Sequence, residues 1–574
     1  MNATISRAFL PILIGFFIVT GFTSAWATTY YVDATSGNDG NNGQFTTSPW
    51  KTIAKVNAAT FQPGDQVLLK RGGVWREQLN PKSSGLQGSP IFYGAYGTGN
   101  KPSIRGSNTY NTTGNWVLES GNLWYLASLS KDPGIFAHDQ ITGLRKLQKS
   151  SLASQWDYWY DATNMRLYVY STANPATLAT SLEVAVRQYV IGPQSASFIT
   201  YDNLDVRHAY NIGWLGWGGK YVTFQYCNFT QSGGDHLLFH NGSNNGLVTN
   251  CSFDDWGIGA GQYYAVHTQG YGTICTGPVD IQDNTFTFSS VVDGAVYAQP
   301  SPLEHTVIMQ DINSWIRNVQ RNSIDGQNHI NDDGIVIWDS GSAATSHLVE
   351  GNVIKNIGGI AITIQQLENH GAHPAVTVRY NRMDNVCLAA TNDKAAIRLR
   401  GFSSASPVSV YNNIVNKTQQ GTYGQPGIDL SGASGAKIYN NTIYGVDKGI
   451  WVRNSSTGAV GMNNIIFNNR SYGIQVDSTS SIIADYNCLN SNAVSNYSGL
   501  SAGSHDVTLN PLLANAASGD FHLTYSSPCK DKGLYVGLTQ DISSGLVPTG
   551  AGTDIGAYEY VNVPLPAPTN LRVQ

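Results

Sequence analysis

The stretch that decides the fold is residues 441–466, which read NTIYGVDKGIWVRNSSTGAVGMNNII. It opens with Asn441-Thr-Ile443 and, 23 residues later, repeats the same phrase as Asn464-Ile-Ile466. Between the two lies a second phrase, Gly449-Ile-Trp-Val-Arg453, in which apolar residues alternate with variable ones. Self-similarity at a short interval is typical of a solenoid, in which each repeat is one structural turn.

The asparagine phrase recurs down the second half of the chain as Asn, one residue and then an apolar residue. The steps between successive positions run from 23 to 38 residues, which indicates one turn of constant size plus loops of variable length. We interpret the Asn side chains as an inward ladder at a bend, where stacked amides satisfy one another and the backbone. The further positions are Cys227, Cys251, Asn284, Asn322, Asn352, Asn381, Asn412 and Asn487.

The composition excludes some classes of protein. The formal net charge is −5, and nothing favours a nucleic-acid partner, which would select a basic surface. Six Cys in 574 residues are not a disulfide framework, and no Cys/His spacing resembles a zinc site. Cys227 and Cys251 are expected to stack about one strand spacing, ~4.8 Å, apart. They form either a disulfide or two buried side chains of the ladder.

Residues 1–27 have the features of a secretory signal peptide. Arg7 is followed by an apolar core from Phe9 to Val19 that is too short to span a bilayer, and Ala25-Trp-Ala27 fits the small-x-small cleavage rule. The alternative is an uncleaved anchor. No other apolar stretch is long enough to cross a membrane. We therefore expect a protein secreted to the extracellular space or periplasm, without a transmembrane segment in the mature chain, that acts as a monomer.

The rest of the chain divides by pattern. Residues 28–105 are expected to form an N-terminal cap, with helical spacing from Trp50 to Ala59, and the first coils. Residues 106–190 alternate aromatic and turn residues, which predicts an inserted β-rich subdomain. Residues 191–560 carry the repeated coils. Residues 561–574 are a Pro-rich linker that either starts a fibronectin type III module or ends in disorder.

Both ends of the repeat region resemble a known superfamily. The phrase PGDQVLLKRG at 63–72, followed by GAYGTGNKPSIRG at 94–106, is similar to the start of secreted right-handed parallel β-helix proteins of the pectate-lyase-like superfamily. Asp554–Glu559, with the sequence DIGAYE, resembles their closing turn. The resemblance covers residues 29–560. It implies an all-β, right-handed parallel β-helix with an N-terminal cap helix and an inserted small β-subdomain, and a carbohydrate-active protein of unspecified chemistry.

The Gly-apolar-x-apolar-x phrase predicts which side chains face solvent. Strand side chains alternate, so the apolar pair points inward and the x pair outward, and in-register stacking aligns the x residues of successive coils. The first x column reads Val336, Thr363, Arg398, Asp429, Trp451 and Gln475. The final x column reads Trp338, Gln365, Arg400, Ser431, Arg453 and Asp477, and we extend it backwards to His240, His267 and Tyr297.

This outward face is a candidate polysaccharide-binding surface. Aromatic faces cover sugar rings, and the Arg fork grips carboxylates or sulfates. The alternative is a solvated face on which nothing binds. The substrate-binding candidates are Trp338, Tyr297, Trp451, Arg453 and Asp235.

Two adjacent acids, Asp332 and Asp333, are candidates for hydrolysis. The phrase Asn-Asp-Asp-Gly-Ile resembles the adjacent-Asp motif of polygalacturonase-type hydrolases, which implies one carboxyl that protonates the leaving oxygen and one that activates water. The Gly-His-Gly motif of those enzymes is absent from the sequence, and of their Arg-x-Lys only Arg398-Leu-Arg400 is similar. The alternative is a tight turn in which Asp bonds its own backbone.

A basic cluster favours β-elimination on a uronic acid. That reaction needs a neutralised C6 carboxylate, a base for the C5 proton and an acid for the leaving oxygen. We predict Lys394 as the base and Arg398 and Arg400 as the carboxylate clamp, with His240, His267 or Tyr263 as the alternative acid or base. The alternative is a set of solvated charges. The sequence identifies no cofactor; a divalent cation such as calcium is compatible, although no run of Asp matches the calcium site of pectate lyases.

Three hypotheses follow. The first is a secreted polysaccharide lyase that acts on a uronate-containing glycan, favoured by the basic cluster. The second is a glycoside hydrolase that uses paired Asp, favoured by Asp332 and Asp333. The third is a non-catalytic glycan-binding or cell-surface protein, favoured by the absence of any complete catalytic motif. We prefer the lyase.

Overall fold

The computed structural model describes most of the chain between residues 27 and 561. The described residues are 27–258, 263–270, 273, 275, 277–288, 305–329, 332–339, 346–367, 375–389, 393–406, 408–418 and 424–561. The predicted signal peptide, except its last residue, lies outside them, as do Tyr297 and residues 562–574 of the linker. None of the described helices has the length and apolar character needed to cross a membrane.

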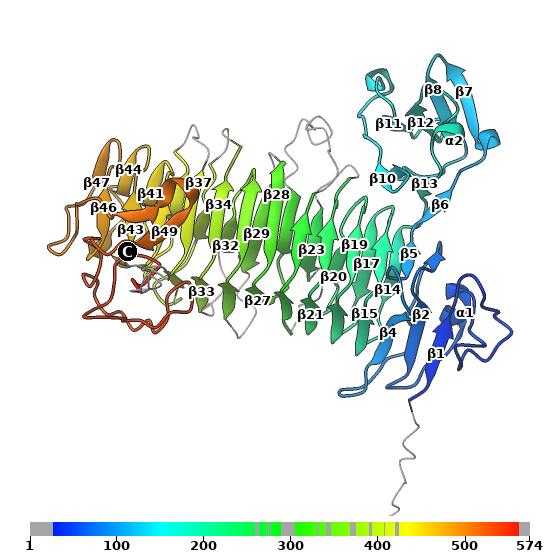
Figure 1. The fold of residues 1–574 in the computed structure, drawn as a ribbon, viewed down its shortest axis with the longest axis horizontal. Coiled ribbons are helices and arrows are strands. Elements are labelled where there is room, and N and C mark those ends of the chain that lie inside the picture. The colour runs from blue at the N-terminus through cyan, green and yellow to red at the C-terminus, as the bar shows by residue number, and fades with distance from the viewer. Residues whose placement is uncertain are drawn as a thin grey trace, which may run out of the picture.

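Three long parallel sheets run the length of the solenoid (Figure 1). Sheet A consists of β1 (Thr29–Val32), β2 (Gln66–Lys70), β4 (Ile91–Tyr96), β15 (Ile199–Asp202), β18 (Val222–Gln225), β21 (Gly246–Thr249), β24 (Val279–Gln282), β27 (Ile316–Gln320), β30 (His347–Glu350), β33 (Val376–Arg379), β36 (Val408–Tyr411), β39 (Lys437–Tyr439), β42 (Ala459–Met462) and β45 (Ile482–Asp485).

Sheet B consists of β3 (Val74–Trp75), β5 (Ser103–Arg105), β16 (Asp205–Arg207), β19 (Asn228–Thr230), β22 (Ser252–Asp254), β25 (Thr285–Thr287), β28 (Ser323–His329), β31 (Val353–Ile357), β34 (Arg382–Val386), β37 (Ile414–Thr418), β40 (Thr442–Tyr444), β43 (Ile465–Phe467) and β46 (Cys488–Asn490). Sheet C consists of β14 (Tyr189–Gln194), β17 (Ile212–Trp217), β20 (Leu237–His240), β23 (Tyr264–Gln269), β26 (His305–Gln310), β29 (Asp332–Asp339), β32 (Ile362–Gln366), β35 (Ile397–Arg400), β38 (Pro426–Ser431), β41 (Lys448–Arg453), β44 (Tyr472–Val476) and β47 (Ser495–Ser498). From β14 onward, successive coils each contribute one strand to each sheet, so the fold is a right-handed parallel β-helix, as predicted.

The core lies between the sheets and is built from stacked apolar side chains. In sheet C, a column of isoleucines from successive strands is fully buried and pairs in register. Each such burial contributes roughly 2 kcal/mol to stability. The column is Ile335, Ile362, Ile397, Ile428, Ile450 and Ile474. This stacking fixes the register and therefore also the outward columns.

The asparagine ladder is present, with one correction to its register. Asn381 donates its amide N–H to Val349 O and Asn413 Oδ1, at 2.9 and 3.0 Å, and its own Oδ1 accepts from the Asn352 backbone N–H. Asn413 therefore holds the ladder position, and the assignment to Asn412 was wrong. Two adjacent asparagines satisfied the phrase, but the inward apolar residue of this coil is Val415, which pairs with Met383. Cys227 and Cys251 stack as free buried thiols, with the Cys227 N–H 3.4 Å from Cys251 Sγ.

The N-terminal end is capped and an independent β-unit is inserted near it (Figure 1). Helix α1 (Ile53–Ala58) begins where the Thr52 side chain accepts from the Lys55 N–H, and it buries Ile53 and Val56. Between β5 and β14 lie two four-stranded antiparallel sheets. Their elements are β6 (Ser107–Thr109), β9 (Phe136–His138), β10 (Ile141–Thr142) and β13 (Leu182–Ala185), then β7 (Trp116–Ser120), β8 (Leu123–Leu126), β11 (Tyr158–Asp161) and β12 (Arg166–Tyr170), with the short helix α2 (Pro175–Leu178).

The C-terminal turns fold back over sheet B (Figure 1). They contain a short antiparallel pair, β48 (Leu513–Asn515) and β49 (Asp520–Leu523). The Gly556 N–H donates to Asn463 O, and the Ala557 N–H donates to Thr442 Oγ1. The segment covers the last coils of sheet B and leaves the outer face of sheet C to the candidate site.

Candidate functional site

A cleft of about 280 Å³ opens on the outer face of sheet C, between β23 and β35. It gathers Asp333, Lys394, Arg398, Arg400 and Trp338, all of which the sequence pattern selected. These residues come from two coils, those of β29 and β35, and the outward columns hold Trp338, Arg398 and Arg400. The other lining residues are Tyr264, Thr306, Met309, Val336, Ile360, Thr363, Gln365 and Asp393.

The two outward columns have the predicted register in the later coils. Trp338 pairs with Gln365, Gln365 with Arg400, and Ser431 with Arg453. His267, however, pairs with Leu238 and Met309 and so stands in the first x column, not the final one. The placement of His267 in the final column was wrong. Gln269 holds that position beside His240.

Lys394 and Asp333 form a buried ion pair at the cleft. Lys394 Nζ lies 3.5 Å from Asp333 Oδ1, and the side chains are only 4% and 7% exposed. The same Asp333 oxygen accepts the Ile360 backbone N–H at 2.5 Å. The pair places a cation and a carboxylate, both with little water around them, next to the space where a ligand would lie.

Arg398 is held by two carboxylates. Its Nε lies 2.7 Å from Asp429 Oδ2, and a terminal nitrogen lies 3.0 Å from Asp393 Oδ1. Arg453 also contacts both acids, at 2.7 Å to Asp393 and 2.9 Å to Asp429. Burial alone would raise the pKa of the Asp393 carboxyl, but its bonds to Arg453 and Arg398 lower that pKa below the ordinary value. Arg398 and Arg453 are thus committed to a structural network.

Arg400 differs from its neighbours because its guanidinium is exposed and makes no ion pair with any residue that the structure describes. It stands two strands from Trp338 in the same column, and the Trp338 side chain is 39% exposed. An unpaired guanidinium and an open aromatic ring at one cleft suit a ligand with a sugar ring and a negative charge.

Asp235 and His267 lie at the β23 end of the cleft but are not among its lining residues. His267 Nδ1 is 3.0 Å from Asp235 Oδ2, and Asp235 Oδ1 accepts the Tyr264 backbone N–H. The other ring nitrogen of His267, Nε2, is buried and has no hydrogen-bond partner among the described residues. Tyr264, whose ring packs 4.3 Å from that of His267, lines the cleft. His267 therefore contacts the site through Tyr264.

The other predicted residues spread along the same face. The Trp451 ring carries Lys448 Nζ at 3.3 Å and the Arg453 guanidinium at 4.0 Å, so it is partly covered by cations. His240 stacks on the half-exposed Trp217 at 4.8 Å. That pair stands three strands from Trp338, ~14 Å away at ~4.8 Å per strand. Tyr297 and the side chain of Asp332 lie outside the described residues.

Sequence reasoning missed Asp393, Tyr264, Thr306 and Met309. Asp393 precedes Lys394 in the segment before β35, outside the alternating phrase, and only its contacts with Arg398 and Arg453 connect it to the site. In the part of the chain that the structure describes, no group of three or more His, Cys, Asp or Glu is arranged to hold a metal ion. A calcium ion stays a prediction.

No family model matches the chain. Over 82 residues it is 42% identical to a lacto-N-biosidase of Bifidobacterium longum subsp. longum; this covers 14% of the chain and only 5% of that protein. The solved complex of XylC with xylose superposes with a TM-score of 0.54 at 12% identity, over 93% of this chain and 98% of the other. Pectate lyase Pel9A gives a TM-score of 0.37 at 15% identity, over 93% and 96%.

The fold is a parallel β-helix, and its overall architecture is shared with the solved XylC structure. At these identities the structural likeness defines the architecture and does not define the chemistry.

Proposed function

We propose that the protein is a secreted monomeric enzyme that cleaves an acidic polysaccharide by β-elimination in the sheet C cleft. The observation that carries the proposal is Arg400, an exposed guanidinium without an ion-pair partner among the described residues, in the same cleft and column as the open Trp338 ring. Trp338 covers a sugar ring, and Arg400 neutralises the C6 carboxylate of a uronic acid. Neutralising this group makes the adjacent C5 proton more acidic.

The Lys394–Asp333 pair supplies the base. In the elimination the C5–H bond breaks and its proton moves to Lys394 Nζ, a C4=C5 double bond forms, and the C4–O4 electron pair leaves with the oxygen. Lys394 must first lose a proton, and Asp333, 3.5 Å away, can hold it. Since a neutral pair is favoured over an ion pair when water is excluded, a bound glycan that covers the cleft promotes this transfer. The leaving oxygen takes a proton from the Tyr264 hydroxyl, which lines the same cleft.

Glycoside hydrolysis is the second candidate, and the 42% identity to a lacto-N-biosidase over 82 residues favours it. A two-carboxylate hydrolase needs one carboxyl that stays protonated as the acid. Against this, Asp393 has a lowered pKa and Asp333 is paired with a cation. Asp393 is therefore not suited to donate a proton, and Asp333 gains one only from Lys394, the base of the elimination, so elimination is the better match.

The products decide between the two reactions. The full-length mature protein is incubated with polygalacturonate, alginate and neutral glycans, and the new reducing ends are measured together with the ultraviolet absorbance of a C4=C5 double bond. We expect both signals on an acidic glycan, and neither from Lys394→Met. Reducing ends without absorbance would establish hydrolysis instead, and no products on any glycan of the panel would refute enzymatic cleavage of these substrates. N-terminal sequencing of the protein from the medium tests removal of residues 1–27.

A further inference from the structure

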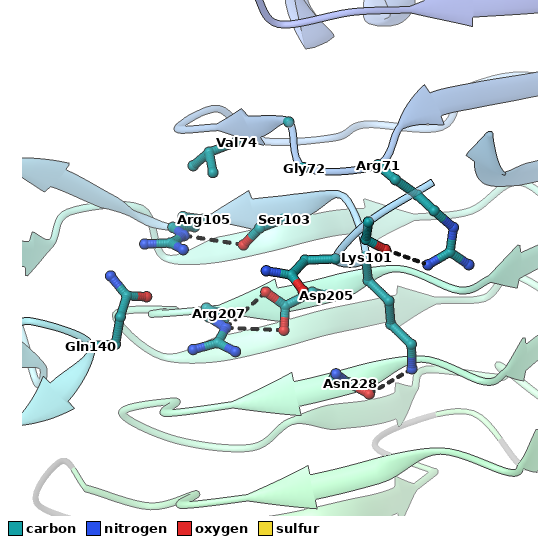
Figure 2. Close-up of a pocket in the computed structure, with 13 residues that line it drawn as sticks. Arg71, Gly72, Val74, Lys101, Ser103, Arg105, Gln140, Asp205, Arg207 and Asn228 are labelled. Atoms are coloured by element: carbon teal, nitrogen blue, oxygen red, sulfur yellow. Dashed lines mark hydrogen bonds and ion pairs between the residues drawn. The ribbon is translucent and has the colours of Figure 1, made fainter. Parts of the chain in front are cut away.

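A second and larger cleft lies on sheet B, at the junction of the solenoid and the inserted β-unit (Figure 2). Its volume is about 780 Å³. We call it the basic cleft. It is lined by Arg71, Gly72, Gly73, Val74, Gly99, Asn100, Lys101, Ser103, Arg105, Gln140, Asp205, Arg207 and Asn228. It occupies a different sheet from the cleft that contains Arg400.

The basic cleft has a net positive charge although the whole chain is acidic. Four of its lining residues are cations and one, Asp205, is an acid. Among the described residues, Arg71 donates to two neutral oxygens, Gly99 O and Asn203 Oδ1. Lys101 likewise contacts Tyr226 O and Asn228 Oδ1. Two positive charges are therefore held in place by hydrogen bonds that do not neutralise them.

The other two cations stand on neighbouring strands. Arg105 and Arg207 occupy paired positions of β5 and β16, and Figure 2 shows their guanidinium groups side by side with the Gln140 amide nearby. Arg207 uses its Nε for Asp205, and Arg105 pairs with the buried Glu183. Burial, and then the like charges of Arg207 and Arg76, lower the pKa of the Arg105 guanidinium despite the opposing effect of Glu183.

The cations come from successive coils, and neutral polar groups lie between them. Strands of neighbouring coils are ~4.8 Å apart, so the charges form a row along the solenoid axis and not a single point. Asn100, Gln140, Asn228 and Ser103 add amide and hydroxyl groups. A ligand that fits such a row carries repeated anionic groups separated by hydroxyls. These are the properties of an acidic glycan with carboxylate or sulfate groups.

We propose that the basic cleft is a second binding site for an acidic glycan, one that holds the chain without cleaving it. No group comparable to the Lys394–Asp333 pair lines it among the described residues, since Asp205 is occupied by Arg207. The site would retain the polymer on one face of the solenoid while another face carries out the reaction. The inference needs only binding, so it does not depend on the proposed elimination.

The test measures the Kd of a fluorescein-labelled polygalacturonate fragment by anisotropy, with labelled dextran as the neutral probe. The measurements use the full-length protein carrying Arg400→Gln, so that the sheet C cleft contributes little. Adding Arg71→Gln and Lys101→Gln should weaken binding about tenfold or more, because two charge-assisted contacts are removed. The matched control is Lys437→Gln on β39, an exposed cation of sheet A, which should leave the Kd unchanged.

A gain of affinity separates binding from folding defects. Asp205→Asn removes the one lining carboxylate and frees the Arg207 guanidinium, so it should tighten binding of polygalacturonate. Damage to the fold would not produce this result. An unchanged Kd in the Arg71→Gln/Lys101→Gln protein, equal binding of dextran, or displacement of the probe by inorganic phosphate at the same charge concentration would each overturn the proposal. A protein that binds the probe in this way but cleaves none of the glycans would refute the proposed elimination and leave the proposed binding site standing.

Discussion

Lys394 Nζ and Asp333 Oδ1 lie 3.5 Å apart at the cleft of sheet C, in side chains that are 4% and 7% exposed. They are 61 residues apart in the chain, and the coil that contains β32 separates their own coils. Removing one member of such a buried pair is strongly destabilising, because the remaining charge has little water around it. Its presence at a cleft suggests a role beyond stability.

The pair should show strong energetic coupling. Asp333→Asn leaves the Lys394 ammonium in a poorly hydrated site, and we expect the free energy of unfolding to fall by about 2 kcal/mol, less than for a sealed pair because the cleft admits water. Adding Lys394→Met should restore about 1 kcal/mol or more, which urea unfolding of the four proteins of the cycle would measure. If the two single changes simply add within about 0.5 kcal/mol, the residues do not interact as the distance indicates.

A side chain of the asparagine ladder should contribute more to the free energy of unfolding than an exposed amide of the same solenoid. Asn381→Ala deprives Val349 O, the Asn352 N–H and Asn413 of their partners in a fully buried position. We expect a loss of about 3 kcal/mol in the free energy of unfolding. Asn318→Ala on β27, which removes one bond to Asp280 at a partly exposed position, is the control and should stay within about 1 kcal/mol. Equal losses would mean that the ladder is only a marker of the repeat.

The fold and most of the candidate cleft follow from periodicity, because alternation fixes which side chains leave a strand and stacking fixes which ones meet. From β29 onward the inward positions are apolar, and Trp338, Gln365 and Arg400 align as predicted. In β23 the rule failed. There Thr268 takes an inward position and bonds Ser314 Oγ at 2.9 Å, so the apolar signal is lost and His267 was assigned to the wrong column.

The pairing of the charges was beyond sequence reasoning. Periodicity places Arg398 and Arg400 on one face but does not predict which of them forms an ion pair with an acidic side chain. Asp429 follows from the column, since it pairs with Arg398 in the next strand. Asp393 does not, because it belongs to a segment without a repeat, and its position depends on how that segment turns toward Arg453.

Acid should destabilise the fold through His236. This ring is fully buried, its Nε2–H donates to Asp254 O at 2.9 Å, and its Nδ1 accepts from Ser232 Oγ at 2.8 Å. Burial lowers the pKa of His236 to about 3, against an ordinary value of about 6.5. The unfolded chain therefore binds the extra proton first, and the stabilising effect of the neutral ring, complete above pH ~6.5, is lost as the pH falls toward 3.

The corresponding measurement compares the wild type with His236→Gln by urea unfolding at pH 7 and pH 5. The deficit of the variant should be larger at pH 7, and should shrink by about 1 to 2 kcal/mol at pH 5. His505→Gln, at a half-exposed histidine beside Asp485, serves as the comparison. A deficit for His236→Gln that does not change with pH would show that the ring is not held neutral.

Arg398 and Arg400 are two residues apart, but their substitution should have different effects. Replacing Arg398 should lower stability, whereas replacing Arg400 should lower activity. Arg398→Ala removes a partner of the fully buried Asp429 and should lower the free energy of unfolding by about 2 kcal/mol. Arg400→Ala removes no ion pair to a described residue, so stability should change by less than about 0.5 kcal/mol. If Arg400 neutralises the substrate carboxylate, kcat/KM on the acidic glycan should nevertheless fall about tenfold or more, with Arg400→Lys recovering part of it. Thermal unfolding and initial rates on the same preparations give both quantities. If the Arg400→Ala protein is fully active, Arg400 is not the carboxylate clamp, and the reason to prefer a uronate-containing substrate is lost.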